Sequence, residues 1–289
     1  MRRSMMFLPG NSPRMLMNGP VLPADSLIFD LEDAVAPDQK DAARVMLAHA
    51  LTSLDFGQKE IVVRINDLAS PYWQADLDKV MPARPNLIMP PKVARAEDIE
   101  KLAAYLDQKE ADLGITAGKT GILPLLELAL GVENAFAIAQ ASPRVVALFL
   151  GGEDLSANLR SPRTKDGWEL FYARTRLVNA ARAAEIDVID TPFTDTDDLE
   201  GLRQDAEFAK SLGFSGKSVI SPRHLDIVNE VFSPSQAEII WAQEVMAVIE
   251  EGKRLGKGAV SLHGKMVDKP IVMRAEQILE NAKAMDYPL

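Results

Sequence analysis

Short apolar segments alternate with longer segments of helical periodicity through the first 230 residues, and this alternation constrains the fold more than any other feature. Between the apolar segments, residues at i, i+3, i+4 and i+7 are apolar, which predicts helices at 38–54, 96–111, 132–141, 169–184 and 199–212. The apolar segments predict eight strands, at 4–8, 26–31, 61–65, 86–90, 121–127, 145–150, 187–190 and 217–220. Buried strands followed by helices are typical of a parallel sheet, and eight such units favour a closed TIM (β/α)8 barrel over an open sheet.

The chain changes character beyond the eighth strand. A long helical segment at 235–254 is followed by a last helix at about 269–284. We therefore expect two parts, a barrel core at 1–232 and a C-terminal helical extension at 233–289, which begins with the last barrel helix. The extension either caps the barrel or reaches a neighbouring subunit.

Composition excludes several classes of protein. The 289 residues include 42 Asp and Glu, 32 Lys and Arg and no cysteine, which leaves a net charge of −10. Without cysteine the chain has no disulfides, thiolate zinc sites or cysteine nucleophiles. The acidic balance disfavours nucleic acid and anionic membranes as partners. Because no apolar segment reaches the roughly 18 residues of a membrane span, and none resembles a signal peptide, we expect a cytoplasmic protein.

Charged and polar residues follow most of the predicted strands. In a (β/α)8 barrel these strand ends meet at one rim, where active sites lie. For any one of these residues the alternative is a solvated loop residue, but five neighbouring strands that each end in a charge indicate a functional site. The residues are Asp30, Glu32, Asp33, Arg64, Asn66, Lys92, Glu127, Glu153 and Asp154.

Glu127 and Asp154 form the most informative pair. They lie 27 positions apart, close to one β/α repeat, so they should close adjacent strands about 4.8 Å apart. Two carboxylates this close repel each other unless a cation or a shared proton lies between them. Oxygen donors without nearby His or Cys favour Mg²⁺ or Mn²⁺ over zinc. The alternative is a pair that Arg64 or Lys92 bridges without a metal.

Motifs along the whole chain resemble one known family. From about residue 2 to residue 280 the chain resembles the citrate lyase β-subunit, within the HpcH/HpaI aldolase and citrate lyase family that includes malyl-CoA and citramalyl-CoA lyases. The segment NLRSPRTKDGWELFYAR, the DT of IDTPF and the ending VSLHGKMVDKP are more similar to the citrate lyase branch. The motifs that carry the resemblance are RRSMMFLPGN, LIFDLEDAVAPDQKDAAR, IVVRIN, MPPK, LLELALGV, LGGEDLSANL, LGFSGKSVISPRH and GAVSLHGKMVDKP.

The resemblance implies a TIM barrel and a role for several residues. It implies that Glu127 and Asp154 bind Mg²⁺, and that Arg64 contacts the substrate's carboxylate or thioester carbonyl. Arg14 and Lys92 are further candidates for substrate binding. Asp33, together with Glu32, would support the water shell of the metal.

A further role carried over from the family concerns the C-terminal extension. The Asp of GKMVD, Asp268, is the implied catalytic base, and in relatives it reaches into an adjoining subunit. Read from the residues alone, Asp268 directly before Lys269 and Pro270 is instead a cap for the last helix. One departure from the family concerns Ser221, because many relatives have His before the proline that follows strand eight.

The implied reaction is Mg²⁺-dependent cleavage of a citryl thioester, on acyl-carrier protein (ACP) or CoA, to oxaloacetate and the acetyl thioester. The implied partners are citrate lyase α and γ subunits and further copies of the chain, as a trimer or hexamer. Two alternatives stay open, a malyl-CoA or citramalyl-CoA lyase or related thioesterase, and a non-catalytic scaffold subunit. Arg160, Arg163 and Lys165 either dock a carrier protein or form a solvated loop.

Overall fold

The computed structural model describes residues 1–255, 260–285 and 287. Contacts divide the chain into two compact units. Residues 2–229 form one of them, here named the sheet unit, and residues 230–289 together with Met1 form the other, here named the C-terminal unit.

The sheet unit is built on a parallel sheet of nine strands in the order β5-β4-β3-β2-β1-β9-β8-β7-β6. The predicted α/β class is therefore confirmed, and the observed strands lie close to the predicted ones because nearly all of their residues are buried. The strands are β1 (Ser4–Pro9), β2 (Ser26–Asp30), β3 (Glu60–Arg64), β4 (Leu87–Met89), β5 (Gly121–Ile122), β6 (Leu125–Leu126), β7 (Ala147–Leu150), β8 (Asp187–Asp190) and β9 (Gly216–Val219).

The predicted strand at 121–127 is interrupted, so the sheet is not the closed ring of eight regular strands that we expected. Its two halves, β5 and β6, are the two ends of the strand order. The interruption falls at Leu123 and Pro124, because proline has no N–H to donate to a neighbouring strand. The segment still bonds on both sides, since Leu123 N donates to Ile88 O (2.9 Å) and Pro124 O accepts from Phe149 N (3.0 Å).

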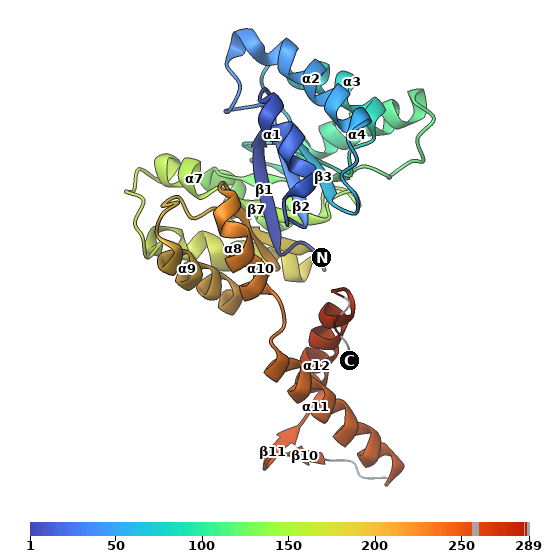
Figure 1. The fold of residues 1–289 in the computed structure, drawn as a ribbon, viewed down its shortest axis with the longest axis vertical. Helices are drawn as coiled ribbons and strands as arrows, with labels where there is room; N and C mark the ends of the chain where they lie inside the picture. The colour runs from blue at the N-terminus through green and yellow to red at the C-terminus, as the bar shows by residue number, and fades with distance from the viewer. Residues whose placement is uncertain (256–259, 286, 288–289) are drawn as a thin grey trace. The chain divides into compact units, whose positions relative to one another are not determined.

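Helices surround this sheet, with α2 to α4 and α7 to α9 on opposite sides of the strands (Figure 1). The predicted helix at 199–212 is confirmed and ends at Gly213, which adopts a φ of 104°. The predicted helix at 132–141 is divided at Asn134. The helices are α1 (Pro13–Asn18), α2 (Lys40–Ser53), α3 (Trp73–Val80), α4 (Ala96–Asp112), α5 (Ala129–Glu133), α6 (Ala135–Gln140), α7 (Gly152–Leu159), α8 (Phe171–Ala183), α9 (Leu199–Leu212) and α10 (Leu225–Phe232).

One cluster of buried side chains from seven of the strands and the link between β5 and β6 forms the inner core of the sheet unit. Because the strands around this core are parallel, their C-terminal ends meet at one edge of the sheet. The cluster contains Met5, Ile28, Val62, Leu87, Met89, Leu123, Leu125, Ala147, Phe149 and Ile189.

The C-terminal unit pairs two helices with a hairpin. It contains α11 (Gln236–Arg254), β10 (Val260–Leu262), β11 (Lys265–Val267) and α12 (Lys269–Lys283). Ser235 and Glu238 form a capping box at the start of α11, where Glu238 N donates to Ser235 Oγ at 3.2 Å. The hairpin was not predicted. Its two-residue turn, His263–Gly264, has positive φ at both residues, as a type I′ turn requires.

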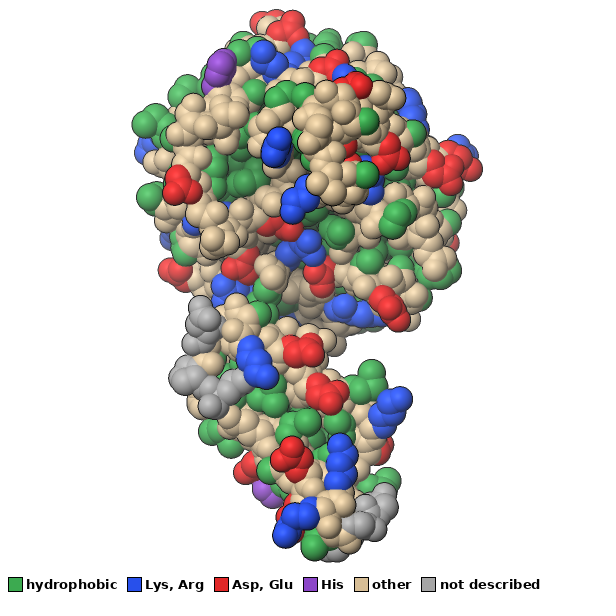
Figure 2. Space-filling model, turned by 90° about the vertical axis from the view of Figure 1, so that its right-hand side faces the viewer, with side chains coloured by type: hydrophobic (Ala, Val, Ile, Leu, Met, Phe, Trp, Pro, Cys, Tyr) green, Lys and Arg blue, Asp and Glu red, His purple; other side chains and the backbone are tan. Residues whose placement is uncertain are grey.

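The surface of the sheet unit does not segregate its charge on the face that Figure 2 draws. There Lys and Arg side chains alternate with Asp and Glu side chains over the whole face. Among the described residues, no helix combines the length and the apolar character needed to cross a membrane.

Candidate active site

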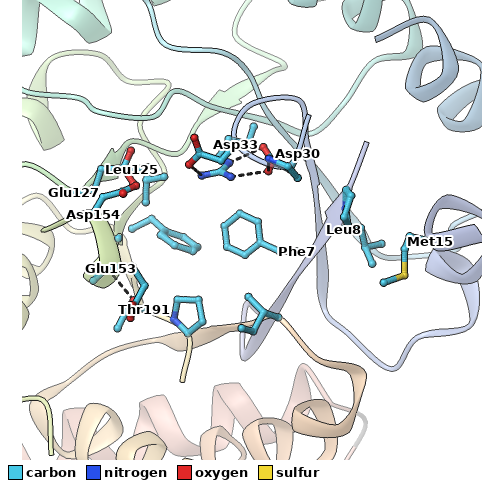
Figure 3. Close-up of a pocket in the computed structure, with 18 residues that line it drawn as sticks. Phe7, Leu8, Met15, Asp30, Asp33, Leu125, Glu127, Glu153, Asp154 and Thr191 are labelled. Atoms are coloured by element: carbon cyan, nitrogen blue, oxygen red, sulfur yellow. Dashed lines mark hydrogen bonds and ion pairs between the residues drawn. The ribbon is translucent and has the colours of Figure 1, made fainter. Parts of the chain in front are cut away.

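A cavity of about 570 Å³ opens at the C-terminal ends of the strands (Figure 3). Its charged walls come from the ends of β2, β3, β6 and β7, and its apolar wall includes Phe7 of β1, Phe149 of β7 and Ile220 after β9. The rings of Phe7 and Phe149 pack edge to face with centroids 5.8 Å apart. The charged strand ends predicted a functional site at this edge of the sheet. The cavity lies at the same edge, and several of these charged residues line it.

Arg64 and Asp30 form the central ion pair of the cavity. The two residues are register partners on β3 and β2. Arg64 Nε lies 2.7 Å from Asp30 Oδ1 and Nη2 lies 2.6 Å from Oδ2, a bidentate geometry. Burial lowers the pKa of Arg64, but the bonds to Asp30 outweigh it and raise the pKa above its ordinary value. Arg64 therefore stays charged, with Nη1 as its remaining donor edge.

Glu32 and Asp33 also face Arg64. Glu32 Oε2 lies 3.2 Å and Asp33 Oδ2 3.6 Å from Arg64 Nη1. Glu32 is buried, whereas the side chain of Asp33 is 57% exposed. Burial raises the pKa of Glu32, and the hydrogen bond from Lys92 opposes that rise. One guanidinium thus faces three carboxylates, that of Asp30 at the end of β2 and those of Glu32 and Asp33 in the loop that follows.

Lys92 connects this loop to Glu127. Its Nζ donates to Glu32 Oε1 at 2.6 Å, and its backbone N donates to Glu127 Oε1 at 2.9 Å. Lys92 adopts a φ of 54°, in the left-handed region that a residue with a side chain seldom occupies. Such backbone conformations cluster at functional sites. Here the residue with the unusual conformation, Lys92, is also the one whose backbone N–H bonds the Glu127 carboxylate.

Glu127 and Asp154 lie side by side on the opposite wall (Figure 3). Burial, followed by repulsion from and hydrogen bonding with Asp154, raises the pKa of Glu127 to about 8. The alternative of a cation bridge is not what the structure shows, because Arg64 pairs with Asp30 and Lys92 Nζ pairs with Glu32. A cation bound between the two carboxyl groups would relieve their repulsion.

This donor set fits a magnesium ion. Mg²⁺ is usually held by one or two carboxylates and keeps several waters or substrate oxygens. Glu127 and Asp154 supply two such oxygen donors, and no His lines the cavity. Within the described part of the chain, no group of three or more His, Cys, Asp or Glu side chains is arranged to hold a metal ion. Two carboxylates beside a cavity leave coordination positions for a substrate.

The remaining predicted site residues lie in different places. Arg14 is exposed on α1. Among the described residues, Arg14, Lys92 and Glu32 do not contribute to the lining of the cavity. Ile220, and not Ser221, contributes to that lining. Asp268 belongs to the C-terminal unit, where it is the N-cap of α12 and accepts from Ile271 N at 3.3 Å. The capping interpretation of Asp268 is therefore confirmed.

The basic segment after α7 is engaged in ion pairs. Arg163 bonds Glu153 (2.9 Å) and Glu169 (2.8 Å), and Lys165 lies 2.9 Å from Asp195. These contacts favour a self-paired loop over a docking surface for a carrier protein.

Sequence reasoning missed three features of the site. The sequence identifies Asp30 only as a strand end. Because Asp30 and Arg64 close neighbouring predicted strands, their ion pair could have been suggested. Thr191, which lines the cavity, was noted only as part of a motif. The third is a buried ion network behind Thr191 that contains Arg174, Asp190, Asp205 and Lys217.

Comparisons with known proteins show the family of this chain. The family model described as HpcH/HpaI aldolase/citrate lyase matches residues 3–222. The citrate lyase subunit beta of Leuconostoc mesenteroides subsp. cremoris is 42% identical over 98% of this chain and 94% of its own length. A (3S)-malyl-CoA thioesterase of Cereibacter sphaeroides is 37% identical over 98% of this chain and 95% of its own.

A solved structure adds a ligand-bound relative. The protein CitE from Mycobacterium tuberculosis, in complex with magnesium, acetoacetate and coenzyme A, superposes with a TM-score of 0.79 at 30% identity, over 98% of both chains. The resemblance to the citrate lyase β-subunit is thus confirmed, and this chain belongs to the HpcH/HpaI aldolase/citrate lyase family.

Proposed function

We propose that the chain is a Mg²⁺-dependent carbon-carbon lyase that cleaves a citryl thioester to oxaloacetate and an acetyl thioester. The observation that carries the proposal is the pair of Glu127, which is buried, and Asp154, which is exposed, in the wall of a cavity that the Arg64 guanidinium also lines. The 42% identity to a citrate lyase subunit beta supports the choice of substrate.

Glu127 and Asp154 would hold the metal, and Asp33 with Glu32 would orient its water shell. Bound Mg²⁺ supplies Lewis acidity that lowers the pKa of a substrate hydroxyl and orients that hydroxyl with its neighbouring carboxylate. Because the pKa of Glu127 is raised to about 8, a proton on Glu127 has to leave before both carboxylates can act as ligands.

Arg64 would stabilise the negative charge that develops on the thioester. Cleavage turns the hydroxyl carbon into the ketone of oxaloacetate, and the electrons of the broken bond form a thioester enolate, which a proton converts to the acetyl thioester. Nε and Nη2 of Arg64 bond Asp30, so Nη1 is the proposed donor for this charge, and there the substrate would compete with Glu32 at 3.2 Å and Asp33 at 3.6 Å. Arg14 and Lys92 would contact the substrate's outer carboxylates.

Asp268 is the proposed base that takes the hydroxyl proton. We propose that the C-terminal unit delivers it to the site of a neighbouring subunit, in a homotrimer or hexamer. Cap and base are compatible roles, because a capping carboxylate has a second oxygen. Citrate lyase α and γ subunits are the proposed further partners, and the cytoplasm is the proposed location.

We also infer that the sheet closes into a (β/α)8 barrel through the segment at 121–126. Its support is that this one segment bonds β4 on one side and β7 on the other. A closed barrel brings the ends of β2, β3, β6 and β7 around a single cavity.

A coupled assay tests the proposal. The assay would follow release of oxaloacetate, glyoxylate or pyruvate from citryl, malyl and citramalyl thioesters of CoA and of ACP. We expect oxaloacetate, and we expect Glu127→Ala and Asp154→Ala each to abolish it, with the exposed Glu100→Ala on α4 as control. Release of glyoxylate instead would favour the malyl-CoA alternative, which the 37% identical thioesterase supports.

A further inference from the structure

The helix that carries Asp154 begins at residues that cannot cap it. The N-cap of α7 is Gly151, which has no side chain to accept from the first turn. A Cβ at Gly151 would lie 2.7 Å from Glu127 Cβ, and a Cβ at Gly152 would lie 2.7 Å from Leu170 Cδ1. The close approach of α7 to Glu127 at Gly151, and to Leu170 at Gly152, therefore requires glycine at both positions, and the N-cap has no side-chain acceptor of its own.

Thr191 supplies the missing acceptor from another strand. Its Oγ1 accepts from Gly152 N at 2.9 Å, and the side chain is fully buried directly after β8. A buried backbone N–H that loses its partner costs the full desolvation of that group, so this bond holds the start of α7 firmly. Asp154 lies two residues further along, in the same first turn.

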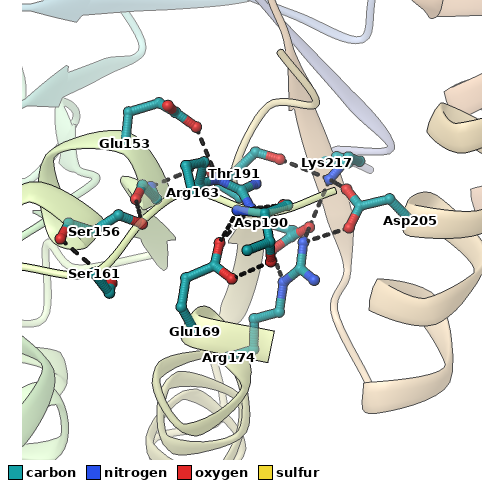
Figure 4. Close-up of polar contacts among 12 residues, drawn as sticks. Glu153, Ser156, Ser161, Arg163, Glu169, Arg174, Asp190, Thr191, Asp205 and Lys217 are labelled. Carbon is teal, nitrogen blue, oxygen red and sulfur yellow. Dashed lines mark hydrogen bonds and ion pairs between the residues drawn. The ribbon is translucent and has the colours of Figure 1, made fainter. Parts of the chain in front are cut away.

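A buried ion network holds Thr191 in turn (Figure 4). Lys217 Nζ donates to Thr191 O and to Asp190 Oδ2, both at 2.7 Å. Arg174 bonds Asp190 and Asp205, and all of these residues are buried. By contrast, the pair between Arg163 and Glu153 on the outer side of the same turn is partly exposed, and exposed pairs hold geometry weakly.

We propose that Thr191 is a positioning residue that fixes the first turn of α7 and thereby sets the Asp154 carboxylate against Glu127 for metal binding. This inference rests on the metal site of the proposed function. Valine at position 191 would fill the same volume but leave Gly152 N unpaired. The first turn of α7 would then shift so that water can bond this amide. Serine would restore the acceptor.

The test measures Mg²⁺ binding separately from turnover. Calorimetry with MgCl₂ and no substrate, and hydrogen exchange of the amides at 152–154, would be compared for the wild type, Thr191→Val and Thr191→Ser. The control is Thr175→Val on α8, whose hydroxyl donates to carbonyls of its own helix. Thr191→Val should bind Mg²⁺ at least about tenfold more weakly and exchange faster, because partners behind a ligand commonly contribute 10- to 100-fold to affinity.

The results for the other variants and for the wild type decide whether the proposal stands. Thr191→Ser and Thr175→Val should stay within about twofold of the wild type, and saturating Mg²⁺ should restore most of the turnover of Thr191→Val. Unchanged affinity and exchange in Thr191→Val, or a wild type that does not bind Mg²⁺, would overturn it. If Thr191→Val does not fold, Thr191→Ala replaces it. A wild type that binds Mg²⁺ but releases no oxo acid refutes the proposed function alone.

Discussion

The carboxyl groups of Glu127 and Asp154 lie side by side in the wall of the cavity, and burial together with repulsion from Asp154 raises the pKa of Glu127 to about 8. A group whose pKa rises on folding from 4.5 to about 8 binds its proton more tightly in the folded state. Folding is therefore penalised increasingly as the pH rises from 4.5 to 8. The site is built at a cost to the stability of the metal-free protein.

The first prediction follows from the loss of stability that the raised pKa of Glu127 causes as the pH rises. In EDTA, Glu127→Gln should raise the melting temperature at pH 8 and flatten the loss of stability between pH 5 and pH 8. One pKa unit corresponds to about 1.4 kcal/mol, so the gain should be on the order of 2–4 kcal/mol. Urea denaturation at several pH values measures it, with the exposed Glu100→Gln as control. A wild type with the same pH slope as Glu127→Gln would contradict the prediction.

Asp30 is predicted to matter more for stability than the other carboxylates around Arg64. Asp30→Asn would leave the buried guanidinium without its bidentate partner, and would also disturb the bonds that Asp30 accepts from the amides of Glu32 and Ala34. Breaking a buried pair commonly costs 3–5 kcal/mol, and we expect about 3 kcal/mol here.

Asp33→Asn is the matched control for Asp30→Asn. Its carboxylate lies 3.6 Å from Arg64 and is mostly exposed, so the change should cost less than about 1 kcal/mol. Urea denaturation of both variants separates the two contributions. Equal losses of stability would show that Asp30 is not the principal partner of Arg64.

The local pattern of the chain predicted most strands and helices, because apolar periodicity follows burial closely. The strand at 187–190 and the helix at 199–212 were predicted to the residue. Pro124 was visible inside a predicted strand and could have warned of the break. The Glu127 and Asp154 pair was found because one β/α repeat separates the two residues.

The parts that were missed depend on contacts between distant segments. Asp30 pairs with Arg64 because the register of β2 and β3 places them opposite each other, and the sequence does not specify that register. The bond from Gly152 to Thr191 joins residues that are 39 positions apart. The ends of neighbouring predicted strands bring Asp30 near Arg64, but no local pattern of the kind that periodicity provides specifies either contact.

Gly151 is predicted to be irreplaceable for metal binding. A Cβ there would lie 2.8 Å from Glu127 Oε2, so Gly151→Ala should displace the Glu127 carboxylate and weaken Mg²⁺ binding by at least tenfold. Overpacking a site of this kind also costs about 1–3 kcal/mol of stability. Titration with MgCl₂ by calorimetry measures the affinity.

Gly114→Ala separates the two effects of Gly151→Ala. Gly114 has a φ of 64° and open space around its Cα, so alanine strains the backbone without touching the site. It should lower stability and leave Mg²⁺ affinity unchanged. Normal Mg²⁺ affinity in Gly151→Ala would mean that Glu127 can move aside without loss.

The two roles of Asp268 are predicted to be separable. Ser caps a helix about as well as Asp, so Asp268→Ser should melt like the wild type, whereas Asp268→Ala should lose about 1 kcal/mol. If Asp268 is also the base, both variants should lose turnover by about a hundredfold or more. Mixing Asp268→Ser with the inactive Glu127→Ala should then restore activity if neighbouring subunits share a site, and mixing Asp268→Ser with Asp268→Ala should not. Full activity of Asp268→Ser alone would reduce Asp268 to a helix cap and require a different base.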